Sequence, residues 1–215
     1  MTGYSYSQIM VYTLLASMVS HLVYTGFEYQ VNEDIKNGGL NKYLVKPVNY
    51  RSYQFFSFLG EKAPQLLILL AVAAALLIFS VAVLGLMLSF PRVLAFLVSL
   101  ILALVLNFFI FYCVALISFW LTDVNLLFGT VSVVLVVVSG GVFPMDIFGE
   151  RIAFAVNLLP FGYTTQFPVN IINGRFGLKE TGAGFLCQIF WICCFGMLAE
   201  ILWKRGLKRF TVVGG

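Results

Sequence analysis

Two apolar stretches in the middle of the chain, residues 64–90 and 93–121, meet at the short turn "SFPR". Each is longer than the roughly 20 residues that a helix needs to cross about 30 Å of hydrocarbon. A turn this short joins two helices into a hairpin and leaves no room for a domain between them. With 61% hydrophobic and 10% charged residues, the composition lies outside the range of soluble globular domains. The sequence therefore predicts an integral membrane protein.

Five membrane spans are predicted, each bounded by a charged, Pro- or Gly-containing break. They cover roughly residues 8–25, 64–90, 93–121, 126–147 and 183–203. The expected fold is all-α and polytopic, with one membrane domain over residues 1–215. The first span carries Thr13, Ser17, Ser20 and His21, which favours packing against other helices over contact with lipid.

The positions of Lys and Arg predict the orientation, because cytoplasmic loops are enriched in these residues. Nine of the 13 basic residues lie in the loop 26–63 and in the C-terminal tail, so both are expected to be cytoplasmic. The "SFPR" turn and residues 148–182 are then external, and so is Met1. Because nothing in the chain would carry Met1 across the membrane, we expect a further N-terminal span upstream, which would give six spans. The expected location is the cell (plasma or inner) membrane.

The search for chemistry within the chain is negative. No Lys is followed by Ser or Thr, so the phosphate-binding Gly-x-x-x-x-Gly-Lys-Ser/Thr loop is absent, and nucleotide chemistry would have to come from a partner. His21 is the only histidine, and it is interpreted as an interfacial residue in preference to a proton relay. The four cysteines lie in apolar runs without metal-ligand spacing. We predict no catalytic residue, metal site or cofactor in this chain, and no nucleic-acid partner.

The acidic residues stand at the edges of spans, as Glu28, Asp123 and Glu200 do. The simplest interpretation is that they are solvated helix ends. Asp146 and Glu150 are four residues apart and resemble an acid–base pair, but no base or nucleophile accompanies them, so no catalysis is assigned.

The fourth span is unusual because it runs into Gly140-Gly141 and then Pro144, which should break the helix near its outer end. The segment that follows is amphipathic and aromatic, and Pro160 and Pro168 interrupt it. It predicts short helices that lie at the outer interface or dip back into the membrane. The alternative is a kinked helix followed by a surface loop.

The densest polar block, "EDIKNGGLNKYLVKP" at residues 33–47, lies in the first cytoplasmic loop. Phe27, Val31 and Ile35 continue an apolar helical stripe into it, and Glu33 and Asp34 are expected to form the polar face of that helix. The Gly-Gly pair is expected to end the helix.

Asn41 is then expected to cap a short helical turn over residues 42–45, which stops before a Lys-Pro pair. Such a projection suits a groove on another protein, or alternatively the anionic inner leaflet. Its exposed face is predicted to carry Leu40, Lys42, Tyr43, Leu44 and Lys46.

This block resembles the Glu-x(n)-Gly-x-Leu-x-x-Leu-Leu-x-x-Pro pattern in the first cytoplasmic loop of ABC-2-type permeases, the membrane subunits of one class of ATP-binding-cassette exporters. The later segment "FPMDIFGERIAFAVNLLPFGYTTQFPVNII" is similar to the segment between the last two spans of that family. The resemblance covers the whole chain, is strongest to the branch of uncharacterised ABC-2 permeases, and starts at the second of the family's six spans.

The resemblance implies that residues 33–47 hold a coupling helix, which sits in a cleft of an ATP-binding subunit. The coupling residues carried over are Glu33, Gly39, Leu40, Tyr43, Leu44 and Pro47. It also implies short external helices over residues 142–180 that close the outer end of the pathway. The residues assigned to this external gate and broken helix are Gly140, Gly141, Pro144, Pro160, Phe161 and Pro168.

The predicted function is that of the membrane-spanning subunit of an ABC exporter, in which two permease subunits, identical or different, pair with two ATPase subunits that hold ATP and Mg. The uncharged span centres favour an amphipathic or hydrophobic substrate. A secondary transporter or channel would be expected to show inverted repeats or buried charges, and a membrane enzyme would show a polar catalytic cluster. A scaffold subunit without its own pathway is the remaining alternative.

Overall fold

The computed structural model describes residues 6–84, 90–121, 123–145, 149 and 158–213. Every regular element in these ranges is a helix, which confirms the predicted all-α class. The α-helices are α1 (Tyr6–Val23), α2 (Phe27–Lys36), α3 (Asn41–Leu44), α4 (Tyr50–Leu84), α5 (Phe90–Leu116), α6 (Asn125–Val138), α8 (Gln166–Ile172) and α9 (Leu178–Val213). Two short 3-10 helices, η1 (Ile117–Phe119) and η3 (Phe161–Tyr163), complete the set.

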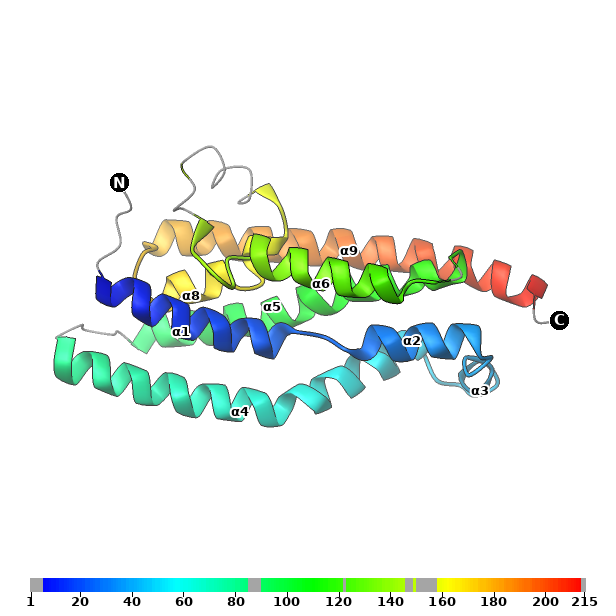
Figure 1. Cartoon of the computed structure of the whole chain (residues 1–215), viewed down its shortest axis with the longest axis horizontal. Helices are drawn as coiled ribbons and strands as arrows, with labels where there is room; N and C mark the ends of the chain where they lie inside the picture. Colours follow the sequence, from blue (N-terminus) through cyan, green and yellow to red (C-terminus); the bar gives the residue numbers. More distant parts are fainter. Residues whose placement is uncertain (1–5, 85–89, 122, 146–148, 150–157, 214–215) are drawn as a thin grey trace.

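The long helices lie side by side along one axis of the molecule (Figure 1). α1 and α2 run toward the end that carries α3, α4 returns, α5 runs out again, α6 returns, and α9 finishes near α3. We call this end the α3 end, and the opposite end, which holds α8, the α8 end. The segment between α1 and α4 and the C-terminal part of α9 thus share one end, as the predicted orientation requires.

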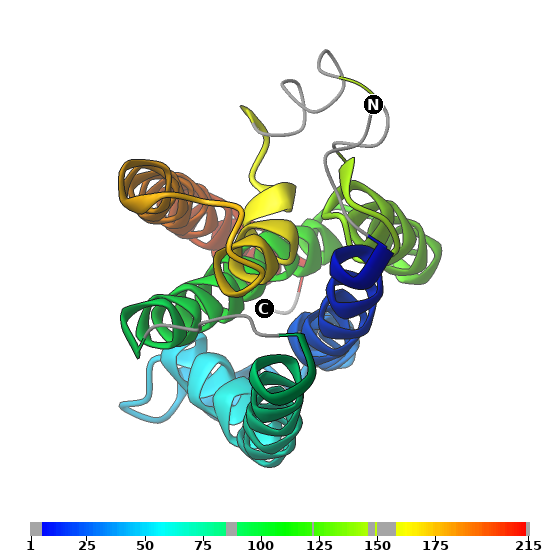
Figure 2. The ribbon, with the colours of Figure 1, turned by 90° about the vertical axis from the view of Figure 1, so that its left-hand side faces the viewer.

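α5 is the central helix of the bundle, since it contacts α9, α8, α2 and α1. Viewed along the bundle, it lies between α9 on one side and α1 and α4 on the other (Figure 2). Its buried residues Phe96, Leu100, Ala103 and Asn107 recur every three or four positions, which is the spacing of one helix face. Further along α5, burial extends around most of the helix.

An aromatic cluster joins α5 to its neighbours at the level where α1 ends and α2 begins. The ring of Phe108 on α5 stacks on Phe27 of α2 at a centroid distance of 4.9 Å. Phe55 and Phe58 of α4 approach the same ring at 5.1 and 5.7 Å. These large apolar rings fix α2 and α4 against the central helix.

Among the described residues, two helical stretches are long and apolar enough to cross a membrane, Phe90–Phe119 and Leu178–Phe210. They coincide with the predicted spans 93–121 and 183–203. Asn125–Val138 is a shorter apolar helix. The predicted total of five spans remains a prediction.

α4 begins much earlier than expected, because the sequence predicted a loop as far as residue 63 and a span from Pro64 onward. The helix starts at Tyr50 and contains Pro64 in its interior. A proline there lacks the N–H that would bond to the carbonyl of Gly60 one turn earlier, and its ring crowds that carbonyl. Gly60 is an exposed residue, and α4 bends along its length (Figure 1).

Candidate functional site

The α2–α3 segment at the α3 end begins as predicted. Phe27, Val31 and Ile35 are buried on one face of α2, which ends at Lys36. Gly38 has a φ of +72°, a left-handed conformation that glycine adopts without steric cost. The predicted amphipathic helix and its glycine stop are therefore confirmed.

α3 differs in detail from the prediction. It spans Asn41–Leu44, and no side chain caps it, because its N-cap position is occupied by Leu40. The predicted capping role of Asn41 is wrong: the backbone N–H of this residue instead donates to the carbonyl of Gly38 at 3.1 Å. The backbone of the glycine turn thus starts the short helix.

Leu40 was predicted to lie on the exposed face of this turn, and that prediction is wrong. Its side chain is fully buried in the hydrophobic core. Leu44 and Val45 are exposed instead, by 44% and 82%, and Tyr43 is half-buried. Leu44, Val45, Pro47 and Val48 project apolar surface from the turn around α3, and we call these four residues the α3 knob.

Asp34 organises the turn beneath the α3 knob. Its side chain accepts a hydrogen bond of 2.8 Å from the Tyr50 hydroxyl and lies 3.5 Å from the Lys42 ammonium. Its backbone carbonyl accepts the N–H of Leu40 at 2.8 Å. A Cβ at Gly39 would lie 2.5 Å from the Asp34 carboxylate, so only glycine fits there. Asp34 also raises the pKa of Lys42.

The contacts of Tyr50 extend from this carboxylate to both α4 and α9. The Tyr50 hydroxyl accepts a hydrogen bond of 2.9 Å from Gln54, and its ring stacks on Trp203 of α9 at 5.4 Å. Burial, followed by the hydrogen bond to Asp34, raises the pKa of Tyr50. One residue further along α4, Arg51 forms a 2.8 Å salt bridge with Glu200 of α9. The turn that carries α3 is thus linked to two long helices.

Sequence reasoning placed both Glu33 and Asp34 on the polar face of α2 and carried over only Glu33 as a coupling residue. Glu33 is exposed, but Asp34 is buried, so its predicted place on the polar face is wrong. A signal was present, because Asp34 follows Val31 by three positions and therefore falls on the apolar stripe of α2. A carboxylate on a buried stripe requires partners. Nothing in the sequence identified Tyr50 or Trp203 as neighbours of that carboxylate.

At the α8 end, α6 stops at Val138, and the predicted break at the Gly-Gly pair is confirmed. Gly140 has a φ of +77°, and its carbonyl accepts a 2.8 Å hydrogen bond from the Tyr12 hydroxyl of α1. The carbonyl of Ser139 accepts the N–H of Gln166 at 2.9 Å. A Cβ at Gly141 would collide with the Ser20 side chain of α1. The break is therefore packed between α1 and α8.

The prolines of this end have separate roles. Pro144 is buried after the break, and Pro160 is the N-cap residue of η3. Pro168 is the third residue of α8, where the missing N–H has no intrahelical partner to lose. All seven residues of α8 are buried, whereas Phe161 is half-buried. This part of the predicted external segment is packed into the bundle, while Asp146 and Glu150 lie outside the described residues.

Glu28 contradicts the prediction that the acidic residues at span edges are solvated, and Lys62 of α4 is buried as well. Glu28 is fully buried, and neither of its carboxylate oxygens has a hydrogen-bond partner among the described residues. Lys62 of α4 is only 8% exposed and donates to Gln65 at 3.1 Å. Burial raises the pKa of Glu28 and lowers that of Lys62.

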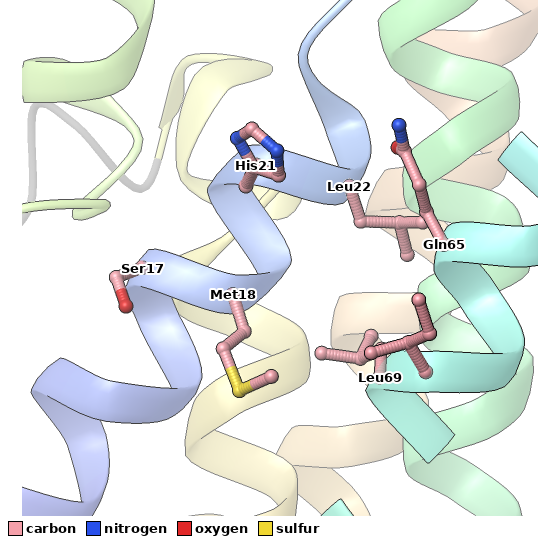
Figure 3. A pocket seen from close by; sticks show the side chains of 7 residues that line it. Ser17, Met18, His21, Leu22, Gln65 and Leu69 are labelled. Carbon is pink, nitrogen blue, oxygen red and sulfur yellow. The ribbon is translucent and has the colours of Figure 1, made fainter. Parts of the chain in front are cut away.

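A groove of about 500 Å³ lies between α1 and α4. Figure 3 shows Met18 and Leu22 of α1 facing Leu69 of α4 across it, with His21 at its rim. The expectation that the polar residues of the first span pack against other helices is wrong for Thr13, Ser17 and His21, which are exposed. The Thr13 and Ser17 hydroxyls donate to backbone carbonyls of α1 itself and need no neighbouring helix.

The side chains of metal-binding types are dispersed over the described part of the chain. Over the described residues, no three His, Cys, Asp or Glu side chains gather closely enough to hold an ion. Cys113, Cys187, Cys193 and Cys194 are all free thiols. The predicted site residues form defined contacts in two regions, the α3 end and the break at the α8 end.

Comparison of the sequence with known protein families identifies a family of membrane transport proteins. A protein-family model described as ABC-2 family transporter protein matches residues 1–214. Neither curated proteins nor solved structures gave a match. The family match extends over nearly the whole chain and confirms the resemblance recognised in its two motifs. The chain belongs to the ABC-2 transporter family and is a membrane permease subunit of an ABC transporter.

Proposed function

We propose that the chain is the permease subunit of an exporter and that its α3 knob docks into a separate ATP-binding subunit. Two permeases, identical or related, pair with two ATPases, and ATP hydrolysis in the partners drives an amphipathic or hydrophobic substrate outward. Five spans of this chain cross the cell membrane, with the α3 end and the C-terminus in the cytoplasm.

The observation that carries this proposal is the exposed apolar surface of the α3 knob. Val45 is 82% exposed and Leu44 and Val48 are 44% and 46% exposed, although they lie at the end of the bundle and not on its long lateral faces. Lys42 and Lys46 are exposed beside them. An apolar centre with a charged rim is the usual composition of a protein–protein contact.

The contacts beneath the α3 knob supply a route for motion. A displacement of α3 would act on Asp34 and, through the Tyr50 hydroxyl, on the start of α4. Stacking of Tyr50 on Trp203 extends the contact to α9. Because these groups are buried or tightly packed, they transmit displacement better than a solvated loop would.

The groove between α1 and α4 supports the substrate class. Its walls include Met18, Leu22 and Leu69, while Ser17, His21 and Gln65 supply polar groups. A surface of this mixed kind accommodates a molecule with an apolar body and a polar group.

The test is co-purification of the cognate ATP-binding subunit with the double variant Leu44→Asp/Val45→Asp. Two buried carboxylates in the docking contact should abolish association, because a charge cannot be desolvated there without a partner. Both side chains are exposed in the free subunit, so the variant should fold and insert normally.

Leu178→Asp is the matched control, since Leu178 is 91% exposed but begins α9 at the α8 end. It should retain the ATPase. If Leu44→Asp/Val45→Asp also retains a fully stimulated ATPase, the α3 knob is not the coupling contact. Exposure of a C-terminal epitope to protease on the outside of intact cells would refute the orientation.

A further inference from the structure

A cavity of about 430 Å³ lies at the α3 end, where the last turn of α2, η1 and the C-terminal part of α9 meet. Two basic side chains line it, Lys36 from α2 and Arg209 from α9. Neither forms a salt bridge with another described residue. The cavity shares no residue with the α3 knob and has no part in the coupling route proposed above.

The wall of the cavity is aromatic. Phe119 of η1 lies 6.0 Å from Trp120 and 6.3 Å from Phe210 of α9, measured between ring centroids. Gly206 of α9 is buried against the Phe119 ring, and a Cβ at this position would overlap that ring. The close approach fixes the ring, so the wall is formed before any ligand arrives.

Ser118 is one of the residues that line the cavity. The residue is 5% exposed, and its hydroxyl oxygen, which is closed off from solvent, has no hydrogen-bond partner among the described residues. Buried hydroxyls are normally hydrogen-bonded. A hydroxyl without a partner in this wall can turn toward an oxyanion in the cavity.

The cavity lies where the two described helical stretches that are long and apolar enough to cross a membrane end, at Phe119 and Phe210. The apolar stretch of α5 and η1 that is long enough to cross the membrane ends at Phe119, one of the lining residues. Trp120 follows directly, and tryptophan is enriched where hydrocarbon meets the headgroups. Asp123 is the nearby acid in the sequence, and its carboxylate accepts the N–H of Asn125 at 3.2 Å.

We propose that this cavity binds the phosphate of an anionic phospholipid from the inner leaflet. Lys36 and Arg209 contact the phosphate oxygens, Ser118 donates a hydrogen bond to one of them, and the aromatic wall covers the glycerol and the start of the acyl chains. A lipid is favoured over a soluble phosphate because the cavity lies at headgroup depth and has an apolar wall. The proposal rests on the proposed orientation, but not on docking of the ATPase.

The experiment measures binding of phosphatidylglycerol to the purified permease in phosphatidylcholine nanodiscs, with native mass spectrometry as the readout. Arg209→Gln and Arg205→Gln form a matched pair, because both arginines are exposed on α9 one turn apart and only Arg209 lines the cavity. Arg209→Gln and Lys36→Gln should each weaken binding about fivefold. Ser118→Ala should weaken it about threefold, and Arg205→Gln should leave it unchanged.

Equal losses for Arg205→Gln and Arg209→Gln would show that the lipid follows the overall charge of the tail, and would overturn the proposal. No loss for either arginine variant would do the same. Displacement of the lipid by inorganic phosphate in a parallel titration would assign the cavity to a soluble anion instead. Size-exclusion profiles establish that the variants are folded, and because no ATPase is present in the assay, these results leave the docking proposal untouched.

Discussion

At the α8 end the break in α6 is held by backbone groups, whereas at the α3 end the turn before α4 is held by side chains around one carboxylate. Gly140 and Ser139 offer their carbonyls to Tyr12 and Gln166. Asp34, by contrast, bonds through its side chain to Tyr50. Both arrangements require a pair of glycines, Gly140-Gly141 at the break and Gly38-Gly39 at the turn, but only the second also depends on a buried carboxylate and its side-chain partners.

The buried polar residues of the two ends differ in the same way. Those around the break and α8 are all uncharged among the described residues, and they include Ser139, Thr165, Gln166 and Asn170. The α3 half of the bundle buries charged groups, which are Glu28, Asp34 and Lys62. The α8 end is therefore built as a fixed junction, while the α3 end carries groups whose interactions change with protonation or with a partner.

The largest effect is expected for Gly140→Ala. Its Cβ would lie 2.8 Å from the Tyr12 hydroxyl and 2.9 Å from Gln166, and its φ of +77° is unfavourable for alanine. The strained φ and the overpacked Cβ add, so the free energy of unfolding should fall by about 4–6 kcal/mol, measured by thermal unfolding in detergent.

Gly129→Ala is the control in α6, the helix that precedes the break, because a Cβ at Gly129 meets nothing within 4 Å. This change should be neutral or stabilising by up to about 1 kcal/mol. Equal unfolding temperatures for the two alanine variants would contradict the view that the break is packed without spare volume.

The next prediction compares a buried apolar residue of the α3 end, Leu40, with an exposed one, Val45. Leu40→Asp places a charge in the core, since Leu40 is fully buried, and should cost about 3–5 kcal/mol. Val45→Asp changes a side chain that is 82% exposed and should alter stability by less than about 0.5 kcal/mol. Chemical denaturation of both variants checks this, and a stable Leu40→Asp protein would disprove the burial of Leu40.

These two positions show what the sequence could and could not reveal. The glycine break and the apolar stripe of α2 followed from local pattern, because φ preference and helical spacing act over a few residues. The burial of Leu40 did not follow, because it depends on the chain folding back over α2. Likewise, Tyr50 and Trp203 are brought to Asp34 only by tertiary packing of α4 and α9. The start of α4 was predicted too late in the sequence, because the first turns of this helix are not apolar enough to resemble a membrane span.

A smaller effect is expected for Tyr50→Phe, which removes the hydroxyl between Asp34 and Gln54 but keeps the ring on Trp203. The buried carboxylate then loses a partner, at a cost of about 1–2 kcal/mol in thermal unfolding. Tyr53→Phe is the control, because Tyr53 is 40% exposed. If both changes are equally mild, the Asp34 hydrogen bond does not stabilise the α3 end.

The smallest effect, on the order of 1 kcal/mol near neutral pH, is expected for Glu28→Gln. Burial raises the pKa of Glu28 above the 4.5 of a free glutamate. Above the pKa of the unfolded state, the folded state therefore holds a proton that the unfolded state releases. The stability of the wild type should fall as the pH rises from the pKa of the unfolded state through that of the folded state.

Glutamine has a similar shape and no charge, so the Glu28→Gln variant should lack this fall and become the more stable protein toward neutral pH. The attraction of Lys62 for the carboxylate lowers the pKa of Glu28 and opposes the rise caused by burial without reversing it. Unfolding temperatures measured between about pH 4 and pH 8 test this, with Glu33→Gln as the control because Glu33 is exposed on the same helix. Parallel curves for wild type and Glu28→Gln would mean that Glu28 is solvated, and the contrast between a neutral α8 end and a charged α3 half would then rest on Asp34 and Lys62.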